Sequence, residues 1–236
     1  MVRGLNGYDI LLLQDTRRRA DARQAIDLAA RLGSIDSDEI SWPDVERVLL
    51  AAFLQSFGVR AELIAPCPDC DETIEIAPDL RDLLAEDPAG PEDVVVQGWQ
   101  LRSGPPTARA MARAALSAPR IGAEVLRASM VLSAEDPDGR PRPVADVPAA
   151  VLDEAFGQTN IAGFLIFEMT CPACETAMVT RLDALELLRS EAALAGDIGA
   201  RARTLSSRLG MSLPDILDLP DAERRSLSRL VAEAAA

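Results

Sequence analysis

The amino-acid sequence predicts a mainly helical α+β protein in which two β-hairpins, each bearing a pair of cysteines, are joined on one four-cysteine site. Three observations support this prediction. The only four cysteines form two Cys-Pro-x-Cys pairs, short apolar runs flank both pairs, and segments rich in alanine and leucine fill much of the remaining chain. Alanine and leucine favour helices, and because aromatic residues make up only 3% of the chain, the core must consist of aliphatic side chains.

The cysteine pairs have the spacing of metal ligands. Two thiolates separated by two residues can bind one side of a tetrahedral metal ion, and a second pair completes the coordination. The chain contains no histidine, so a mixed cysteine and histidine site is excluded. The sequence therefore predicts one structural zinc ion held by two zinc knuckles, with Cys67, Cys70, Cys171 and Cys174 as its ligands.

The surroundings of the two pairs repeat weakly after 104 positions. Each unit is predicted to contain a strand, a cysteine turn, a second strand and a helix, as expected for two half-sites of one zinc ribbon. Asp79 and Asp183 stand near the predicted helix starts, where a carboxylate accepts hydrogen bonds from free amides. The matching segments are 61–64 with 165–168, 73–76 with 177–180, and 79–84 with 183–188.

Three other interpretations of the cysteines remain open. A redox-active pair of the thioredoxin-like kind would open a helix after a strand, whereas here a second apolar run follows each pair. Disulfides are less needed in a chain of 236 residues, which is long enough to bury a core. An iron–sulfur cluster also uses four thiolates. Structural zinc is the favoured interpretation.

The composition of the chain argues against several functions. A net charge of −14 disfavours binding to a phosphate backbone, which needs concentrated positive charge. The sequence contains neither a histidine imidazole for general base work nor a lysine amine for a Schiff base. It also lacks a glycine-rich phosphate loop and a Gly-x-Ser-x-Gly motif. We therefore expect a protein that is not an enzyme and does not bind nucleic acid.

The hydropathy of the chain bears on its location. No apolar run reaches the length that spans a bilayer, and the first eight residues lack the apolar core of a signal peptide. We therefore expect no membrane insertion. A cytoplasmic location is expected, because thiols remain reduced there and can bind a metal ion.

The pattern of apolar residues and chain breakers predicts the other elements. A helix over 42–57 is the best supported, with Ser41 as its cap, Pro43 in its first turn and Gly58 at its end. The other expected elements are helices at 14–32, 107–117, 121–130 and 146–157, one strand at 94–101, and a polar loop at 135–143.

The last third of the chain predicts a long helix. Apolar residues recur at steps of three and four from Leu185 to Leu209, which indicates one continuous apolar stripe that Gly210 ends. Core is the favoured role of this stripe, ahead of an interface with a partner. A short helix from Ser212 and a terminal helix from Asp221 are expected to follow.

These elements define four expected regions that the zinc ion ties into one compact unit. They are an N-terminal helical region at 1–60, the first knuckle and its helix at 61–86, a strand plus helices at 87–160, and the second knuckle with the C-terminal helices at 161–236.

Three sequence blocks in this order resemble a known family. The first is 51–58, which ends in Phe-Gly and leads to the first cysteine pair. The second is 99–108, a predicted strand that ends in a Pro-Thr turn before a helix. The third runs from the second cysteine pair to 209–220. Together they span most of residues 45–235 and resemble the baseplate hub assembly proteins, or chaperones, of contractile-tailed phages and related injection systems.

The resemblance implies a non-enzymatic role in building a baseplate around the spike and tube. It implies hub, spike or wedge proteins as partners, and a cytoplasmic location during assembly that leaves open a place in the finished particle. It transfers no catalytic residue, and only the four cysteines correspond to site residues, as zinc ligands. Two rival functions are a zinc-ribbon adaptor in transcription or RNA processing and, less favoured, a thiol oxidoreductase.

Overall fold

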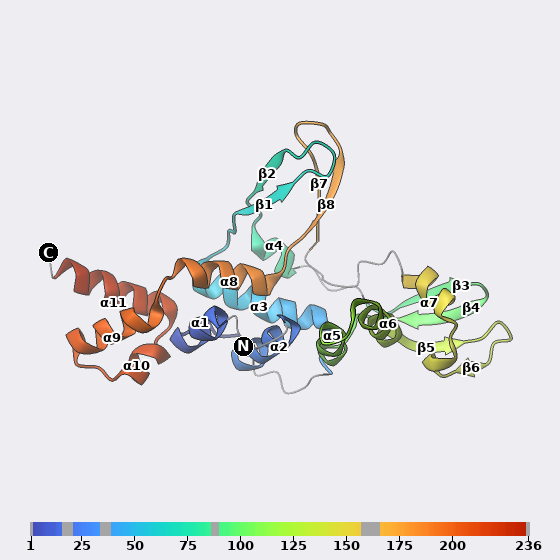
Figure 1. The fold of residues 1–236 in the computed structure, drawn as a ribbon, viewed down its shortest axis with the longest axis horizontal. Helices are drawn as coiled ribbons and strands as arrows, with labels where there is room; N and C mark the ends of the chain where they lie inside the picture. Colours follow the sequence, from blue (N-terminus) through green and yellow to red (C-terminus); the bar gives the residue numbers. More distant parts are fainter. Residues whose placement is uncertain (1, 16–20, 34–38, 86–89, 157–165, 235–236) are drawn as a thin grey trace.

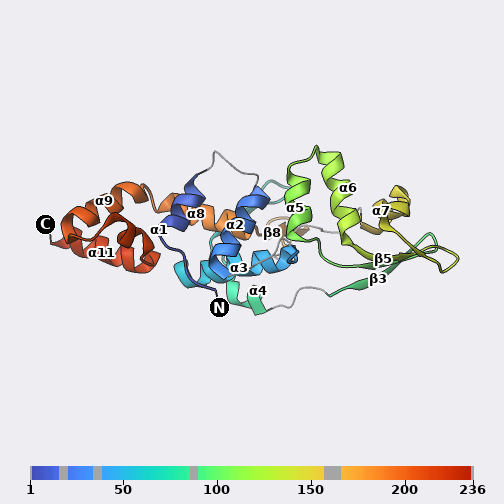
Figure 2. The same cartoon turned by 90° about the horizontal axis from the view of Figure 1, so that it is seen from below.

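The computed structural model describes residues 2–15, 21–33, 39–85, 90–156 and 166–234. Figure 1 shows an elongated molecule with a helical body at its centre, from which two β-hairpins project on one side. A small sheet lies at one end of the long axis, and a group of C-terminal helices lies at the other. Figure 2, a view from below, shows the same elongated arrangement. The structure therefore has the mainly helical α+β class that the sequence predicts.

The helical body is assembled around α3 (Trp42–Phe57). Val45, Leu49 and Phe53 are almost completely buried on this helix. The side chain of Ser41 accepts a hydrogen bond from the amide of Asp44, and Gly58 ends the helix in the positive-φ region, so both predicted caps are confirmed. The helices that contact α3 are α2 (Asp21–Gly33), α4 (Leu80–Ala85), α5 (Ala108–Ala115), α8 (Ala184–Leu194) and α11 (Asp221–Glu233).

The N-terminal segment contains a helix that the sequence analysis did not predict. Helix α1 (Gly7–Gln14) starts at a capping box in which Asn6 and Asp9 accept hydrogen bonds from each other's backbone amides. Arg3 and Arg31 both form ion pairs with the buried carboxylate of Asp9. The expected helix at 14–32 is confirmed over α2, while its residues 16–20 lie outside the described part of the chain.

The sheet at one end corrects the prediction of one strand at 94–101. The structure has two strands there, β3 (Glu92–Val96) and β4 (Trp99–Ser103), joined by a tight turn at Gln97 and Gly98. Both turn residues have positive φ (50° and 83°), as a two-residue hairpin that matches the strand twist requires. Because apolar residues flank this turn on both sides, the sequence pattern predicted a single strand.

The expected polar loop at 135–143 also contains regular structure. Strands β5 (Val131–Glu135) and β6 (Pro141–Arg142) complete an antiparallel sheet of order β3-β4-β5-β6. The carboxylate of Asp136 holds the connection by accepting hydrogen bonds from the amides of Arg140 and Asp138 and from the guanidinium of Arg142, and these bonds lower the pKa of Asp136. The expected helices at 121–130 and 146–157 are confirmed as α6 (Pro119–Met130) and α7 (Ala149–Phe156).

The prediction of one long C-terminal helix is wrong, because the chain forms two helices there. Helix α8 ends before Gly196, which has a φ of 66°, and the side chain of Asp197 accepts a hydrogen bond at the start of α9 (Ile198–Leu209). The apolar stripe is nevertheless core, as predicted, since Leu188 and Leu205 are almost fully buried. The expected short and terminal helices are confirmed as α10 (Leu213–Asp218) and α11.

The C-terminal helices are tied to the start of the chain. The amide of Asp221 donates to the carbonyl of Leu5, and the buried carboxylate of Asp221 pairs with Arg224 and Arg225. No helix in the described part of the chain is both long and apolar enough to cross a membrane.

Because the chain breaks at Gly196, the direction in which Gly196→Ala changes the free energy of unfolding distinguishes two helices from one continuous helix. We expect it to lower the free energy of unfolding by about 1 kcal/mol, because alanine is strained at positive φ. If α8 and α9 were one continuous helix, alanine would instead raise stability through its helix propensity. Urea unfolding measures the change, and Gly196→Asn is the matched control, since asparagine tolerates the left-handed conformation better than alanine.

Candidate metal centre

Both cysteine pairs lie at the tips of antiparallel hairpins, as predicted. The first hairpin consists of β1 (Leu63–Pro66) and β2 (Thr73–Ile76), and the second of β7 (Ile166–Thr170) and β8 (Ala177–Arg181). Figure 1 shows the two hairpins projecting together from the helical body. Two segments far apart in the sequence therefore meet at their cysteine turns.

The two cysteine turns have the same backbone geometry. The amide of Cys67 donates to the carbonyl of Glu72 (2.8 Å), and the amide of Cys171 donates to the carbonyl of Thr176 (2.9 Å). In each turn, the residue four positions after the first cysteine donates back to that cysteine's carbonyl. That residue has positive φ in both turns, 56° at Asp71 and 62° at Glu175. Each turn therefore presents its two sulfurs in the same way.

The repeat extends from the turns into the flanking strands and helices. The pairing of β1 with β2 becomes that of β7 with β8 when every residue number is raised by 104. The same shift relates Leu80, the first residue of α4, to Ala184, the first residue of α8, and both are fully buried. Asp79 and Asp183 accept hydrogen bonds from amides at these helix starts, as predicted. The weak sequence duplication is therefore a structural duplication.

The four sulfurs lie close enough together to share one metal ion. The Sγ atoms of Cys67 and Cys174 are 3.6 Å apart, and those of Cys70 and Cys171 are 3.7 Å apart. All four Sγ atoms lie within 4.8 Å of one another. Metal–sulfur bonds of about 2.3 Å in a regular tetrahedron place the sulfurs about 3.8 Å apart. The four cysteines thus form a cluster that can hold one metal ion.

The closest sulfur contacts join different cysteine pairs, and the cysteines are free thiols. A disulfide would need the two sulfurs at about 2.05 Å. Each pair is followed by a strand, β2 or β8, and not by the helix that a redox-active pair opens. The geometry therefore fits a shared metal ion better than two separate redox pairs.

A small apolar cluster covers one side of the four sulfurs. The first cysteine of each pair, Cys67 and Cys171, is fully buried, whereas Cys70 and Cys174 are exposed. The buried apolar side chains that pack around the first cysteines come from both hairpins: Ala65, Ile74 and Met178. Because protein sulfurs fill all four coordination positions, the site has the closed geometry of structural metal centres.

The two exposed thiols differ in acidity. Hydrogen bonds from the side chain and the amide of Thr176 lower the pKa of Cys174 to about 6. At Cys70, the amide of Glu72 lowers the pKa, but hydrogen bonding to Cys174 and burial outweigh it and raise the pKa to about 12. At neutral pH, Cys174 is therefore a ready thiolate ligand, whereas Cys70 must release a proton when a metal ion binds. Metal affinity should consequently increase with pH.

One side-chain contact links the two turns directly. The hydroxyl of Thr176 in the second turn donates to the carboxylate of Asp69 in the first turn, at 2.6 Å. This hydroxyl has a single proton, so Asp69 and the sulfur of Cys174 compete for it, whereas the amide of Thr176 can donate to Cys174 in either case. The sequence analysis did not identify Asp69 or Thr176 as site residues, because nothing in the sequence indicates that they face each other.

The fold and the site define a class: a mainly helical α+β protein with a four-cysteine metal-binding centre shared by two hairpins. All four sequence-predicted ligands meet in this centre. No protein-family model, curated protein or solved structure matches the chain.

The shared centre predicts that every cysteine is equally necessary. The wild-type protein should bind one metal ion per chain, and each single Cys→Ser variant should lose it. Because the metal joins two hairpins, we expect each variant to unfold about 10 °C lower in a thermal melt. Metal analysis and a thiol titration measure the result, with four thiols becoming reactive only after a chelator is added. Retention of metal in the Cys171→Ser and Cys174→Ser variants would contradict a shared site.

The contact at Thr176 predicts a graded effect. Thr176→Val removes the hydroxyl that lies beside Cys174 and Asp69, so the pKa of Cys174 should rise above 6 and metal affinity should fall on the order of tenfold. Competition with a coloured chelator measures the affinity. Thr73→Val is the matched control, because Thr73 is exposed on β2 and makes no such contact with the sulfurs. Equal affinities of the two variants would show that the hydroxyl is unimportant.

Proposed function

We propose that the four-cysteine centre holds one structural zinc ion, and that the protein is a non-enzymatic assembly factor or structural component of a contractile phage tail or related injection system. One observation carries the proposal. Four sulfurs from two hairpins, 104 residues apart in the sequence, lie within 4.8 Å of one another, so that all four could bind one ion. Such an arrangement stabilises a shape and leaves no open coordination position for chemistry.

The donor set favours zinc among the available metals. Four thiolates in a tetrahedron are typical of structural zinc, which has no geometric preference of its own. A cluster of two or four iron atoms would hold its ligands farther apart, whereas sulfurs within 4.8 Å of one another leave room for a single ion. Metal analysis separates zinc from a single iron ion.

A zinc ion at this site would stabilise the arrangement of the two hairpins and the helices that follow them. Helices α4 and α8 follow the first and second hairpins, and both contact α3. Each hairpin alone has two short strands and little core, so it is marginally stable. A metal ion that joins their tips supplies folding free energy and fixes both hairpins relative to the helical body.

The contractile-tail part of the proposal is supported by the three resembling sequence blocks and by the shape of the molecule. The elongated body exposes large apolar side chains away from the metal centre, including Leu116 and Ile121 at the α5–α6 connection and Leu194 at the end of α8. Large apolar side chains that remain exposed can contribute to protein-binding surfaces. Hub, spike or wedge proteins would be the partners, met in the cytoplasm during assembly.

The proposal is tested by deleting the gene in its source genome and counting contractile particles by electron microscopy. We expect few or no complete baseplates in the deletion strain. The wild-type gene should restore them, and the Cys67→Ser variant should restore fewer, because the hairpins lose their shared metal. The Thr73→Val variant is the control that leaves the centre intact.

Two outcomes would overturn the proposal. Normal baseplates in the deletion strain would exclude a role in assembly. Co-purification of the tagged protein with RNA polymerase, and not with tail proteins, would instead identify a zinc-ribbon adaptor in transcription.

A further inference from the structure

The C-terminal helices form a groove that the metal centre does not involve. Helices α9 and α11 contact each other and lie side by side in both Figure 1 and Figure 2. Three adjoining hollows of about 660, 400 and 340 Å³ lie along them. The first two hollows share Arg201 and Ala232, and the last two share Arg208 and Val231, so together they form one continuous groove.

The groove follows one face of α9. Its lining on this helix recurs at steps of three and four, as at Arg201, Leu205 and Arg208, and runs from Ala200 to Leu209, which at 1.5 Å per residue corresponds to about 14 Å. The length suits a short helix of another protein, because an amphipathic helix binds in such a groove through side chains spaced along one face.

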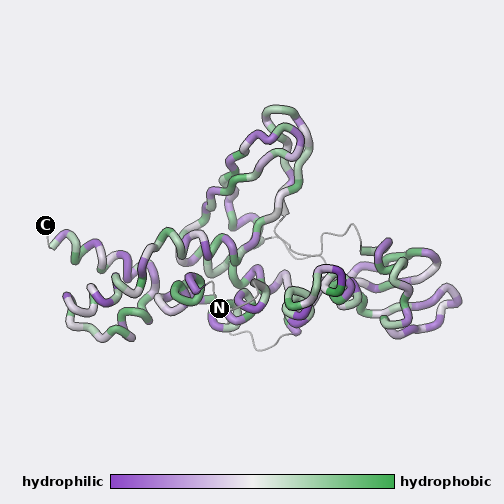
Figure 3. The backbone as a smooth tube through the Cα atoms, in the orientation of Figure 1, coloured by the Kyte–Doolittle hydropathy of each residue, from purple (hydrophilic) through white to green (hydrophobic). Residues whose placement is uncertain are grey.

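The floor of the groove is partly apolar. Leu209, Leu227, Leu230 and Val231 line one end of it, and Leu230 is 60% exposed. Figure 3 shows hydrophilic and hydrophobic stretches alternating along α9 and α11, as expected for helices with one apolar face. Part of that apolar face packs in the core of the C-terminal helices. The remainder lines the groove and stays accessible.

Arginines are the only charged residues among those that line the groove. Arg201 and Arg208 come from α9, and Arg225 and Arg229 come from α11. No aspartate or glutamate lines any of the three hollows, although the chain as a whole has 38 acidic and 24 basic residues. The groove is therefore locally positive on an acidic protein.

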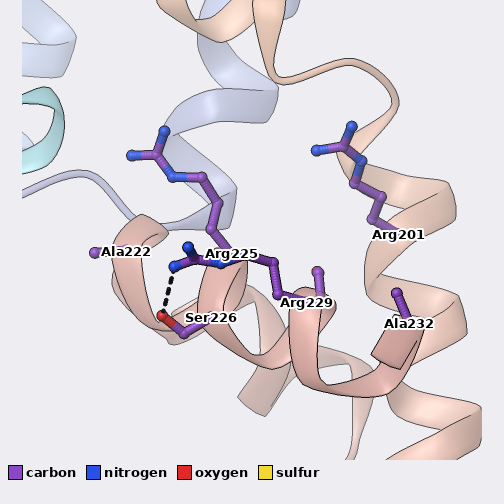
Figure 4. A pocket seen from close by; sticks show the side chains of 7 residues that line it. Arg201, Ala222, Arg225, Ser226, Arg229 and Ala232 are labelled. Carbon is purple, nitrogen blue, oxygen red and sulfur yellow. Dashed lines mark hydrogen bonds between the residues drawn. The ribbon is translucent and has the colours of Figure 1, made fainter. Parts of the chain in front are cut away.

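Three of these arginines lack a carboxylate partner within the described residues. Arg201, Arg208 and Arg229 form no ion pair there, and all three are exposed. Figure 4 shows Arg201 on α9 facing the side of α11 from which Arg225 and Arg229 extend. Arg229 donates only a long hydrogen bond to Ser226, at 3.4 Å.

Arg225 has a different environment. Its guanidinium pairs with Asp221, donates to the carbonyl of Ser56 and lies 5.2 Å from the centre of the Phe57 ring. These contacts fix one side of the groove against the end of α3. Arg225 is therefore a structural residue of the groove, and Arg201, Arg208 and Arg229 are the cations available to a ligand.

We propose that the α9–α11 groove binds an acidic amphipathic helix of a partner protein. Leucine-like side chains of that helix occupy the apolar end of the groove, and its carboxylates pair with Arg201, Arg208 and Arg229. Charge complementarity between such a helix and the arginines favours this partner, whereas a nucleic acid would need positive charge that extends beyond the groove on a chain of net charge −14. The inference deepens the proposed protein-binding role and rests on it.

The test is a selection from a displayed library of random peptides of about 16 residues, a length that spans the groove. The full-length, metal-loaded protein is the target. Enriched peptides should have a net negative charge and apolar residues at helical spacing. In solution, their affinity should fall about tenfold for Arg201→Glu/Arg229→Glu and should weaken with added salt. The matched control is Arg203→Glu/Arg120→Glu, which changes the charge equally at exposed arginines that do not line the groove.

The neutral variant Arg201→Gln/Arg229→Gln should give a smaller loss, and it keeps the test valid if the charge-reversed variant fails to fold. Enrichment of basic or neutral peptides, no enrichment at all, or equal loss in the control variant would overturn the proposal. Arginine-dependent binding of a single-stranded oligonucleotide with no acidic peptide bound would overturn it in favour of a nucleic acid. Because the test needs no tail protein, it can succeed or fail independently of the particle count in the deletion strain.

Discussion

The convergence of four cysteine sulfurs on one point is the constraint on which the centre of the structure depends. The two hairpins that carry them project from the helical body and share a small apolar cluster around Cys67 and Cys171 and the hydrogen bond from Thr176 to Asp69. Short two-stranded hairpins with so little core gain little stability from burial. A metal ion between their tips would replace the missing core by joining segments that the chain itself keeps far apart.

The helical body positions the two hairpins so that their sulfurs converge. Each hairpin continues into a helix, α4 or α8, whose first residue is fully buried and whose start is held by an aspartate, Asp79 or Asp183. Both helices contact α3, whose Val45 and Leu50 are fully buried. The duplicated units are therefore positioned by a shared partner helix, and the small apolar cluster and the contact between Asp69 and Thr176 complete the alignment of the turns.

The metal centre and the α9–α11 groove are separate features with different side-chain chemistry. The centre consists of four sulfurs, whereas the groove combines apolar side chains with three arginines that form no ion pair among the described residues. The proposed role of binding other proteins would use the groove for contact, and a metal ion at the centre would stabilise the body that carries it. The two features depend on different residues, so each can be altered without the other.

Local signals in the sequence determined the four cysteines of the candidate centre, both hairpins, the helix at 42–57 with its caps, and the burial of the C-terminal stripe. These depend on spacings of a few residues, which backbone geometry translates directly into structure. Only the tertiary structure decided the break at Gly196, because apolar periodicity continues across it and one glycine can be accommodated in a helix. The tertiary structure also places Asp69 opposite Thr176 and gathers the arginines of the groove. Long-range packing brings these residues together and leaves no signal in the local sequence.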